Sequence, residues 1–168
     1  MKIFAFVLIL LLLLTACTTA KKYTITVDYP ANITRAEARA GTVMAFSGNS
    51  KEWSNVEKIV DNALSAGLNF YLSPRDASGW AVESVSEDIV EMGFPWRSHY
   101  LRCGIIYQDK SCNLKILSSN NLSESKNRIH RKALALMDRL EISLRKVFGQ
   151  MSASKAQNKD IPTVQPTE

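Results

Sequence analysis

The chain has 168 residues, of which 46% are hydrophobic and 22% are charged, and its formal net charge at pH 7 is +5. This length accommodates one domain that buries roughly two-thirds of its unfolded surface, and no internal repeat or second long apolar run divides it. Residues 123–148 carry 7 basic and 3 acidic side chains, whereas residues 17–122 carry 11 of each sign. The positive charge of the chain is therefore concentrated in one segment.

The N-terminus has the pattern of an export signal. Lys2 is followed by an unbroken run of 12 apolar residues from Ile3 to Leu14. As a helix this run would be about 18 Å long, whereas a membrane-spanning helix needs about 20 residues to cross a core of roughly 30 Å. The run is too short for a stable transmembrane helix and suits the hydrophobic part of a signal peptide.

The segment Leu14-Thr15-Ala16-Cys17 resembles the lipobox of bacterial lipoproteins, which has an aliphatic residue, two small residues and a cysteine. The resemblance implies transfer of a diacylglyceryl group to the Cys17 sulfur, cleavage before Cys17 and acylation of the new amino group. A thiol suits this step because its thiolate is the best side-chain nucleophile near neutral pH. The alternative is an ordinary secretory signal in which Cys17 is incidental.

These features predict a lipoprotein signal peptide over residues 1–16 and a lipidated tether over residues 17–22. Two or three acyl chains give stable membrane anchoring, which one chain does not. Thr18 occupies the place where an aspartate is the usual inner-membrane retention signal of enteric bacteria. The resemblance therefore points to the outer membrane, with the domain facing the periplasm. Export excludes nucleic acid as a routine partner in spite of the basic charge.

The mature domain is expected to begin with a strand. Residues 23–29 alternate apolar and polar side chains, which is typical of a half-buried strand, and Pro30 ends the pattern. Residues 34–45 have a weak helical pattern. Residues 54–66 have a clearer one, with apolar side chains along a single helical face. Ser54-Asn55-Val56-Glu57 has the spacing of a capping box, and Gly67 stands where a glycine commonly ends a helix.

Residues 68–118 have the shorter period of strands. Alternating apolar residues occur over 68–72, 80–82, 101–107 and 112–116, and an apolar segment covers residues 89–94. The polar stretch from Gln108 to Ser111 reads as a hairpin turn. The region is therefore predicted to be an antiparallel meander.

A long helix is expected to close the domain. Apolar residues recur at helical spacing over residues 124–148, and Gly149 is expected to end the helix. The polar, proline-containing residues 149–168 are expected to be a disordered tail. The predicted fold class is α+β, with a single domain over residues 23–148 in which two helices pack on one face of an antiparallel β-meander.

The order of several short motifs resembles a family of small bacterial envelope lipoproteins of uncharacterised function. The matching segments are Gly79-Trp80, Arg97-Ser98-His99, Ile105-Ile106-Tyr107, Ser119-Asn120-Asn121-Leu122 and Ile129-His130. Members often continue after the last motif with a tyrosine-asparagine-x-tryptophan run, and residues 131–136 depart from it. The resemblance implies the fold and the envelope location, and it supplies no activity.

Two cysteines of the mature domain, Cys103 and Cys112, raise the question of a disulfide, because exported domains often contain them. A two-residue turn at Asp109-Lys110 places Tyr107 opposite Cys112 and Cys103 opposite Ile116. The two sulfurs would then lie on one face but about 13 Å apart along the strands, whereas a disulfide needs Cα atoms within about 7 Å. A bond would require a turn at residues 107–108, and two separately buried thiols are the alternative.

The only histidines of the chain are His99 and His130, and they are the candidates for acid–base or metal chemistry. We find no spacing typical of metal ligands and no nucleophile motif, and we expect no catalytic residue, metal or cofactor. Structural histidines between sheet and helix are the simpler interpretation.

The sequence favours a non-catalytic, lipid-anchored binding or structural module. One alternative is a small periplasmic hydrolase that uses His99 or His130. Another is an assembly partner whose basic C-terminal helix binds an envelope protein or an anionic envelope component through Arg128, Arg131 and Lys132.

Overall fold

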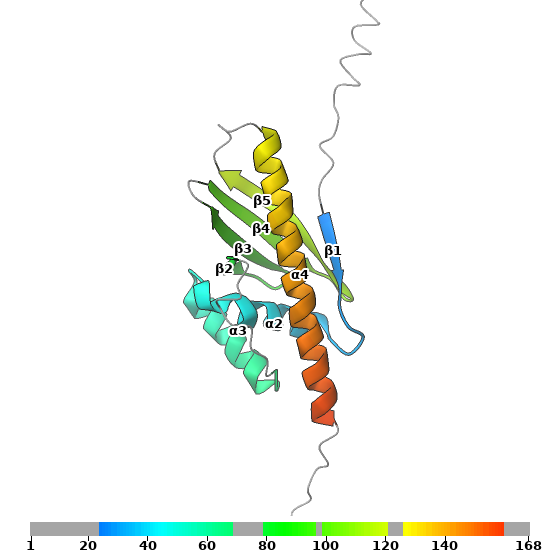
Figure 1. Cartoon of the computed structure of the whole chain (residues 1–168). Helices are drawn as coiled ribbons and strands as arrows, with labels where there is room; N and C mark the ends of the chain where they lie inside the picture. Colours follow the sequence, from blue (N-terminus) through cyan, green and yellow to red (C-terminus); the bar gives the residue numbers. More distant parts are fainter. Residues whose placement is uncertain (1–23, 69–78, 97–98, 121–125, 160–168) are drawn as a thin grey trace, which may run out of the picture.

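The computed structural model describes residues 24–68, 79–96, 99–120 and 126–159. The predicted signal peptide, the tether and most of the alternating residues 68–72 lie outside these ranges. The elements follow in the order β1 (Thr24–Asp28), α2 (Arg35–Phe46), the 3-10 turn η1 (Ser47–Asn49), α3 (Trp53–Ser65), β2 (Ala81–Val85), β3 (Ile89–Trp96), β4 (His99–Tyr107), β5 (Ser111–Asn120) and α4 (Lys126–Lys159). Figure 1 shows α4 running across the sheet, with α2 and α3 at one end of it.

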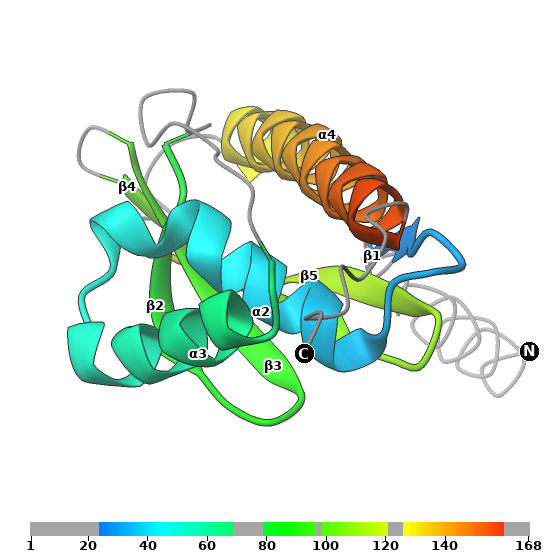
Figure 2. The ribbon, with the colours of Figure 1, turned by 90° about the horizontal axis from the view of Figure 1, so that it is seen from below.

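The five strands form one antiparallel sheet in the order β1-β5-β4-β3-β2. Strands β2 to β5 make the predicted meander, and β1 pairs with β5, where Ile25 lies opposite Leu114. The α+β class is confirmed. The predicted number of helices is wrong, because the described residues form three α-helices rather than two. Figure 2 shows the additional helix, α2, beside α3, and Lys155 of α4 contacts α2 at Glu37.

Helix α2 forms in the segment with the weak helical pattern because its start is capped. The Thr34 hydroxyl accepts a hydrogen bond from the Glu37 backbone N–H at 3.3 Å, and the Glu37 carboxylate accepts one from the Thr34 backbone N–H at 2.8 Å. This reciprocal capping box satisfies two N–H groups that a helix start otherwise leaves free. Packing adds to it, since Val43 and Phe46 are buried in the core.

Helix α3 lies close to its predicted position but starts differently. Its N-cap residue is Glu52, whose side chain makes no capping hydrogen bond, and Trp53 is the first helical residue. The capping box predicted at Ser54 and Glu57 is therefore wrong, because Ser54 already lies within the first turn.

Gly67 ends α3 as expected. It has a φ of 75°, a left-handed conformation that costs glycine little. Its N–H donates to the Leu64 carbonyl at 2.9 Å, and the Leu68 N–H donates to the Ala63 carbonyl at 3.1 Å. These two hydrogen bonds make a Schellman motif, which satisfies carbonyls at the helix end.

Helix α4 does not end at Gly149, so the predicted end of the helix is wrong. It continues to Lys159, and the prediction of a disordered tail is therefore wrong for residues 149–159. A glycine inside a helix costs only about 1 kcal/mol, and contacts beyond it offset this. Met151 is fully buried, and the Ser152 hydroxyl donates to the Asn32 side-chain oxygen at 2.7 Å. Residues 160–168 of the predicted tail lie outside the described residues.

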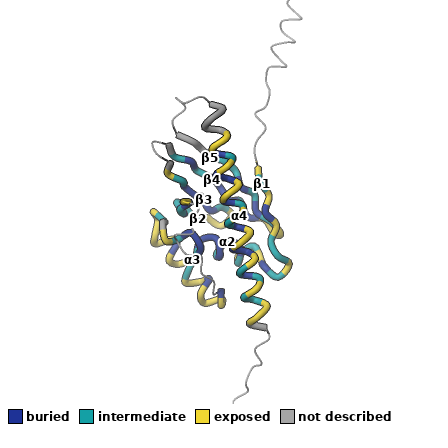
Figure 3. The backbone as a smooth tube through the Cα atoms, viewed as in Figure 1, coloured by how far each residue is buried: buried dark blue, intermediate teal, exposed yellow. Residues whose placement is uncertain are grey.

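The core lies between the helices and one face of the sheet. Alternate residues of the strands point into it, as the period-2 pattern predicts. The buried apolar residues of the strands are Val27, Val82, Val90, Met92, Leu101, Cys103, Ile105, Tyr107, Cys112 and Leu114. Buried residues of all three helices join them in one cluster. Figure 3 shows that buried and exposed residues alternate along α4, as expected for a helix with one face on the core.

Candidate functional site

The residue to which the sequence assigns chemistry, Cys17, lies outside the described residues. The structure describes the chain from Thr24, seven residues later, where it enters the fold as β1. Within the described part of the chain, no helix combines the length and the apolar content needed to cross a bilayer.

The face of the sheet that the helices leave open carries a group of charged side chains. Glu91 on β3 and Arg102 on β4 alternate with the buried residues Met92 and Cys103 and so point away from the core. Glu83 joins them from a β-bulge on β2, since the pairing shifts between Val82 and Ser84. A bulge redirects a side chain relative to the regular pleat.

Ionic contacts link these residues, and we call Lys51, Glu83, Glu91, Tyr100 and Arg102 the sheet-face cluster. The Glu83 carboxylate lies between two cations, 2.9 Å from Lys51 Nζ and 3.3 Å from Arg102 Nε. Arg102 also forms an ion pair and a hydrogen bond with Glu91. The Glu83 side chain is only 10% exposed, whereas those of Arg102 and Lys51 are 42% and 66% exposed.

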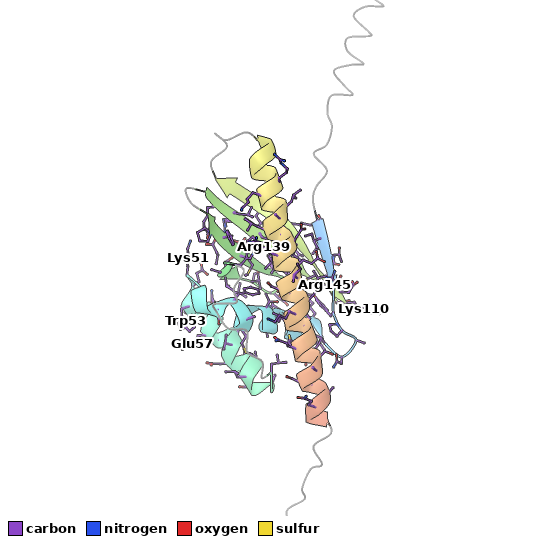
Figure 4. The ribbon with its side chains drawn as sticks, in the orientation of Figure 1. Lys51, Trp53, Glu57, Lys110, Arg139 and Arg145 are labelled. Atoms are coloured by element: carbon purple, nitrogen blue, oxygen red, sulfur yellow. The ribbon has the colours of Figure 1, made fainter. Side chains whose placement is uncertain are left out.

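Lys51 connects this cluster to an aromatic ring. Its ammonium group donates a hydrogen bond to the Tyr100 hydroxyl at 3.1 Å and lies 4.6 Å from the centre of the ring, a cation–π distance. Figure 4 shows Lys51 and Trp53 near each other at the start of α3. Trp53, two residues after Lys51 in the sequence, is 53% exposed.

Gly93 provides the space that the cluster occupies. A Cβ atom at this position would overlap the Tyr100 hydroxyl oxygen and lie 2.6 Å from the Glu83 carboxyl carbon. Any other residue would have to displace one of these side chains. The cluster therefore depends on a glycine in the middle of β3.

The cluster has the properties of a recognition surface. Its two cations and two carboxylates balance, and Arg102 is held between two partners, which limits its freedom before any ligand arrives. Within the described residues, Glu83 Oε1 and Arg102 Nε are buried atoms that make no hydrogen bond. Both atoms lie beneath the surface in ion-pair contacts, Glu83 Oε1 with Lys51 and Arg102 Nε with Glu83. Such combinations of Arg, Tyr and Trp are enriched at protein interfaces.

The two cysteines of the domain are free thiols, and the register explains why. Tyr107 pairs with Cys112 and Cys103 pairs with Ile116, as the two-residue turn predicted. Four residues of strand, or about 13 Å, separate the thiols, and the predicted alternative of a disulfide is wrong. Burial raises the pKa of both thiols to about 12, so neither supplies a thiolate nucleophile near neutral pH.

The other predicted residues lie in three places. The backbone of His99 opens β4 and that of His130 belongs to α4, but their side chains are outside the described residues, as is that of Arg128. Arg131 and Lys132 are exposed on α4. Among the described residues, no group of three or more His, Cys, Asp and Glu side chains could hold a metal ion.

The sequence interpretation missed the sheet-face cluster. Part of the signal was present, because Glu91 and Arg102 each lie between two apolar residues, whereas Glu83 is followed by the polar Ser84. Their convergence depends on the register of three strands and on the bulge at Glu83, which the pattern of single strands does not specify. Comparisons with known proteins add no assignment: no family model, curated protein or solved structure matches the chain.

Proposed function

We propose that this protein is a lipid-anchored bacterial envelope lipoprotein, attached to the outer membrane through Cys17 and facing the periplasm, and that its domain is a non-catalytic binding module. The observation that carries the proposal is Leu14-Thr15-Ala16-Cys17 directly after an apolar run of signal-peptide length. The resemblance to small envelope lipoproteins supports the same location.

The burial of the other two cysteines supports the assignment of lipid attachment to Cys17. Cys103 and Cys112 are buried strand residues whose thiol pKa values are raised to about 12. A thioether to lipid at either position would have to displace the core. Cys17 is the remaining cysteine of the chain, and it precedes the folded domain.

The sheet-face cluster supports the binding role. It combines paired charges with an aromatic ring next to an ammonium group, and Trp53, two residues after Lys51 in the sequence, is also exposed. We infer that this surface contacts a polar envelope component, either protein or glycan. Replacing Trp53 with alanine and Lys51 with methionine would weaken such contacts without removing core residues.

Metabolic labelling tests the anchor. The full chain is expressed in a bacterium with an alkyne analogue of palmitate, and the wild type is compared with Cys17→Ala and with the matched control Cys112→Ala. We expect label on the wild type and on the control, loss of label in Cys17→Ala, and a mature N-terminus at Cys17 by mass spectrometry. Label that persists in Cys17→Ala would disprove the proposal.

Crosslinking tests the binding role. In-cell crosslinking of the labelled protein is compared between the wild type and a variant with Lys51→Met and Trp53→Ala. We expect a specific adduct that the variant loses. An unchanged adduct pattern would show that binding does not use this surface.

A further inference from the structure

The N-terminal segment of the domain and α4 run alongside each other in the same direction. The Arg145 guanidinium donates to the Thr26 carbonyl at 3.4 Å, the Tyr29 ring packs edge-on against Phe148 with 5.4 Å between centroids, and Asn32 bonds to Ser152. Later residues of one segment therefore contact later residues of the other. Figure 1 shows that the start of β1, at Thr24, is the end of the strand nearer to the first turns of α4.

The greatest distance that the segment between Cys17 and Thr24 can span is close to the length of the part of α4 that precedes Arg145. Seven residues separate Cys17 from Thr24, and at full extension they span at most about 25 Å. Helix α4 extends from the level of Thr26, near Arg145, to its start at Lys126. These 19 residues rise about 28 Å. A lipid on Cys17 would thus bring the membrane surface close to the first turns of α4.

The chain is basic at this end. Residues 126–137 contain 4 basic and no acidic residues, and residues 17–23 contain two lysines and no acidic residue. The side chains of Arg131 and Lys132 are exposed, and they lie on the helical face opposite the buried residues Met137 and Leu140. The charge therefore faces outward at the place where the tether would hold the bilayer.

We propose that the first three turns of α4 dock on the anionic phospholipid headgroups of the membrane that holds Cys17, so that the domain stands on this end. The inference rests on the proposed anchoring at Cys17 and adds the partner and the orientation. Arg131 and Lys132 would contact headgroup phosphates, for which guanidinium and ammonium groups are suitable donors. Lipid phosphate fits better than a protein partner because the tether length brings the bilayer to this position.

The consequence for the domain is a defined orientation. The far end of α4, which bonds to Asn32 through Ser152, would point away from the membrane.

Relaxation measurements on the lipidated full chain test this orientation. A spin label is attached at Ala135→Cys or, as a distant control, at Ala153→Cys; both positions are exposed, and the native thiols Cys103 and Cys112 are buried. The protein is reconstituted in phosphatidylcholine vesicles with or without phosphatidylglycerol, and nickel-chelating headgroups report proximity. The two labels are 18 residues apart, or about 27 Å along the helix.

We expect relaxation enhancement at residue 135 and not at 153, only in vesicles with phosphatidylglycerol, and its loss in 1 M salt, where the Debye length is about 3 Å. Arg131→Gln with Lys132→Gln should lower the ratio of docked to undocked domains about 25-fold, at about fivefold per charge. The matched control Lys146→Gln, about 21 Å further along the helix than Lys132, should leave the ratio unchanged, whereas Lys132→Gln alone should lower it about fivefold.

The failures are distinguishable. Protein that carries no lipid and does not sediment with vesicles overturns the anchoring and the docking together. Lipidated protein that sediments but shows equal enhancement at residues 135 and 153, or equal enhancement in phosphatidylcholine alone, overturns the docking and leaves the anchor intact.

Discussion

Removing Arg102 from the sheet-face cluster should destabilise the fold more than its surface position suggests. In Arg102→Met, the Glu83 carboxylate keeps only Lys51 as an ionic partner. The Lys51 side chain is 66% exposed and stays hydrated, whereas the Glu83 side chain is only 10% exposed. The partly buried Glu83 carboxylate would then lack both the hydration that it lost on folding and the ion pair with Arg102 that had compensated for that loss.

The expected magnitude follows from the burial of each partner. Breaking a fully buried ion pair costs about 3–5 kcal/mol, and an exposed pair is worth about 0–1 kcal/mol. Arg102 is 42% exposed and Glu83 is 10% exposed, which places this pair between the two limits. We expect Arg102→Met to lower the free energy of unfolding by about 1–3 kcal/mol.

Urea unfolding followed by tryptophan fluorescence measures this cost. Trp80 is fully buried and packs edge-on against Phe94 with 5.4 Å between ring centroids, so its emission reports the loss of the core. A double-mutant cycle adds Glu83→Gln. The double variant should be less destabilised than the sum of the single variants, with a coupling of about 1–2 kcal/mol.

A matched pair elsewhere provides the control. Arg145 and Glu141 are four residues apart on α4, and the two atoms of their pair lie 2.8 Å apart, but their side chains are 51% and 26% exposed. Glu141→Gln should cost less than about 0.5 kcal/mol. A cost for Arg102→Met as small as this, with no coupling to Glu83, would refute the view that the cluster is a preorganised unit.

Three further predictions use the same unfolding assay. Gly93→Ala should cost about 1–3 kcal/mol, because the new Cβ overlaps Tyr100, whereas Gly149→Ala, with nothing within 4 Å, should be neutral or stabilising. The free energy of unfolding should fall as pH rises above 9, because burial raises the pKa of Cys103 and Cys112 from 9.0 to about 12 in the folded state. The thiols of the unfolded chain ionise first, which lowers the free energy of unfolding by about 1.4 kcal/mol per thiol and pH unit. Constant stability from pH 8 to 10 would contradict this. Lys155→Met should lower the free energy of unfolding by about 0.5–2 kcal/mol at pH 7. Burial alone would raise the pKa of Glu37, but hydrogen bonds from Lys155 and Thr34 outweigh it and lower that pKa. The difference in stability between the variant and the wild type should therefore shrink as pH falls below about 4, and a difference independent of pH would show that Lys155 does not act through the Glu37 carboxylate.

The β4–β5 hairpin shows what the sequence determines locally. A two-residue turn and the alternation on both sides fix the register, and the predicted pairs, Tyr107 with Cys112 and Cys103 with Ile116, are those observed. Register then decides the state of the cysteines, because cross-strand neighbours are fixed once the turn is fixed. Here local rules and tertiary structure agree.

The end of α4 shows where local rules fail. Gly149 and a polar composition indicate a helix end, yet the helix continues because Asn32 and Glu37 bind Ser152 and Lys155. These partners are 118 to 120 residues away in the sequence, so no window around Gly149 contains them. The sheet-face cluster escaped prediction for the same reason, since it joins residues of four different segments.

Strand β1 determines how an anchored domain would be held. It is five residues long and lies at the edge of the sheet, and any tether from Cys17 pulls on it directly. Its pairing with β5 attaches it to the sheet, while Arg145 binds the Thr26 carbonyl and Phe148 packs on the adjoining residue Tyr29. A load on the tether is therefore shared between the sheet and α4. Because β1 is attached both to the sheet and to α4, an anchor at Cys17 would restrict the tilt of the domain as well as its distance from the membrane, and under the proposed docking the basic first turns of α4 would select one orientation among those that remain.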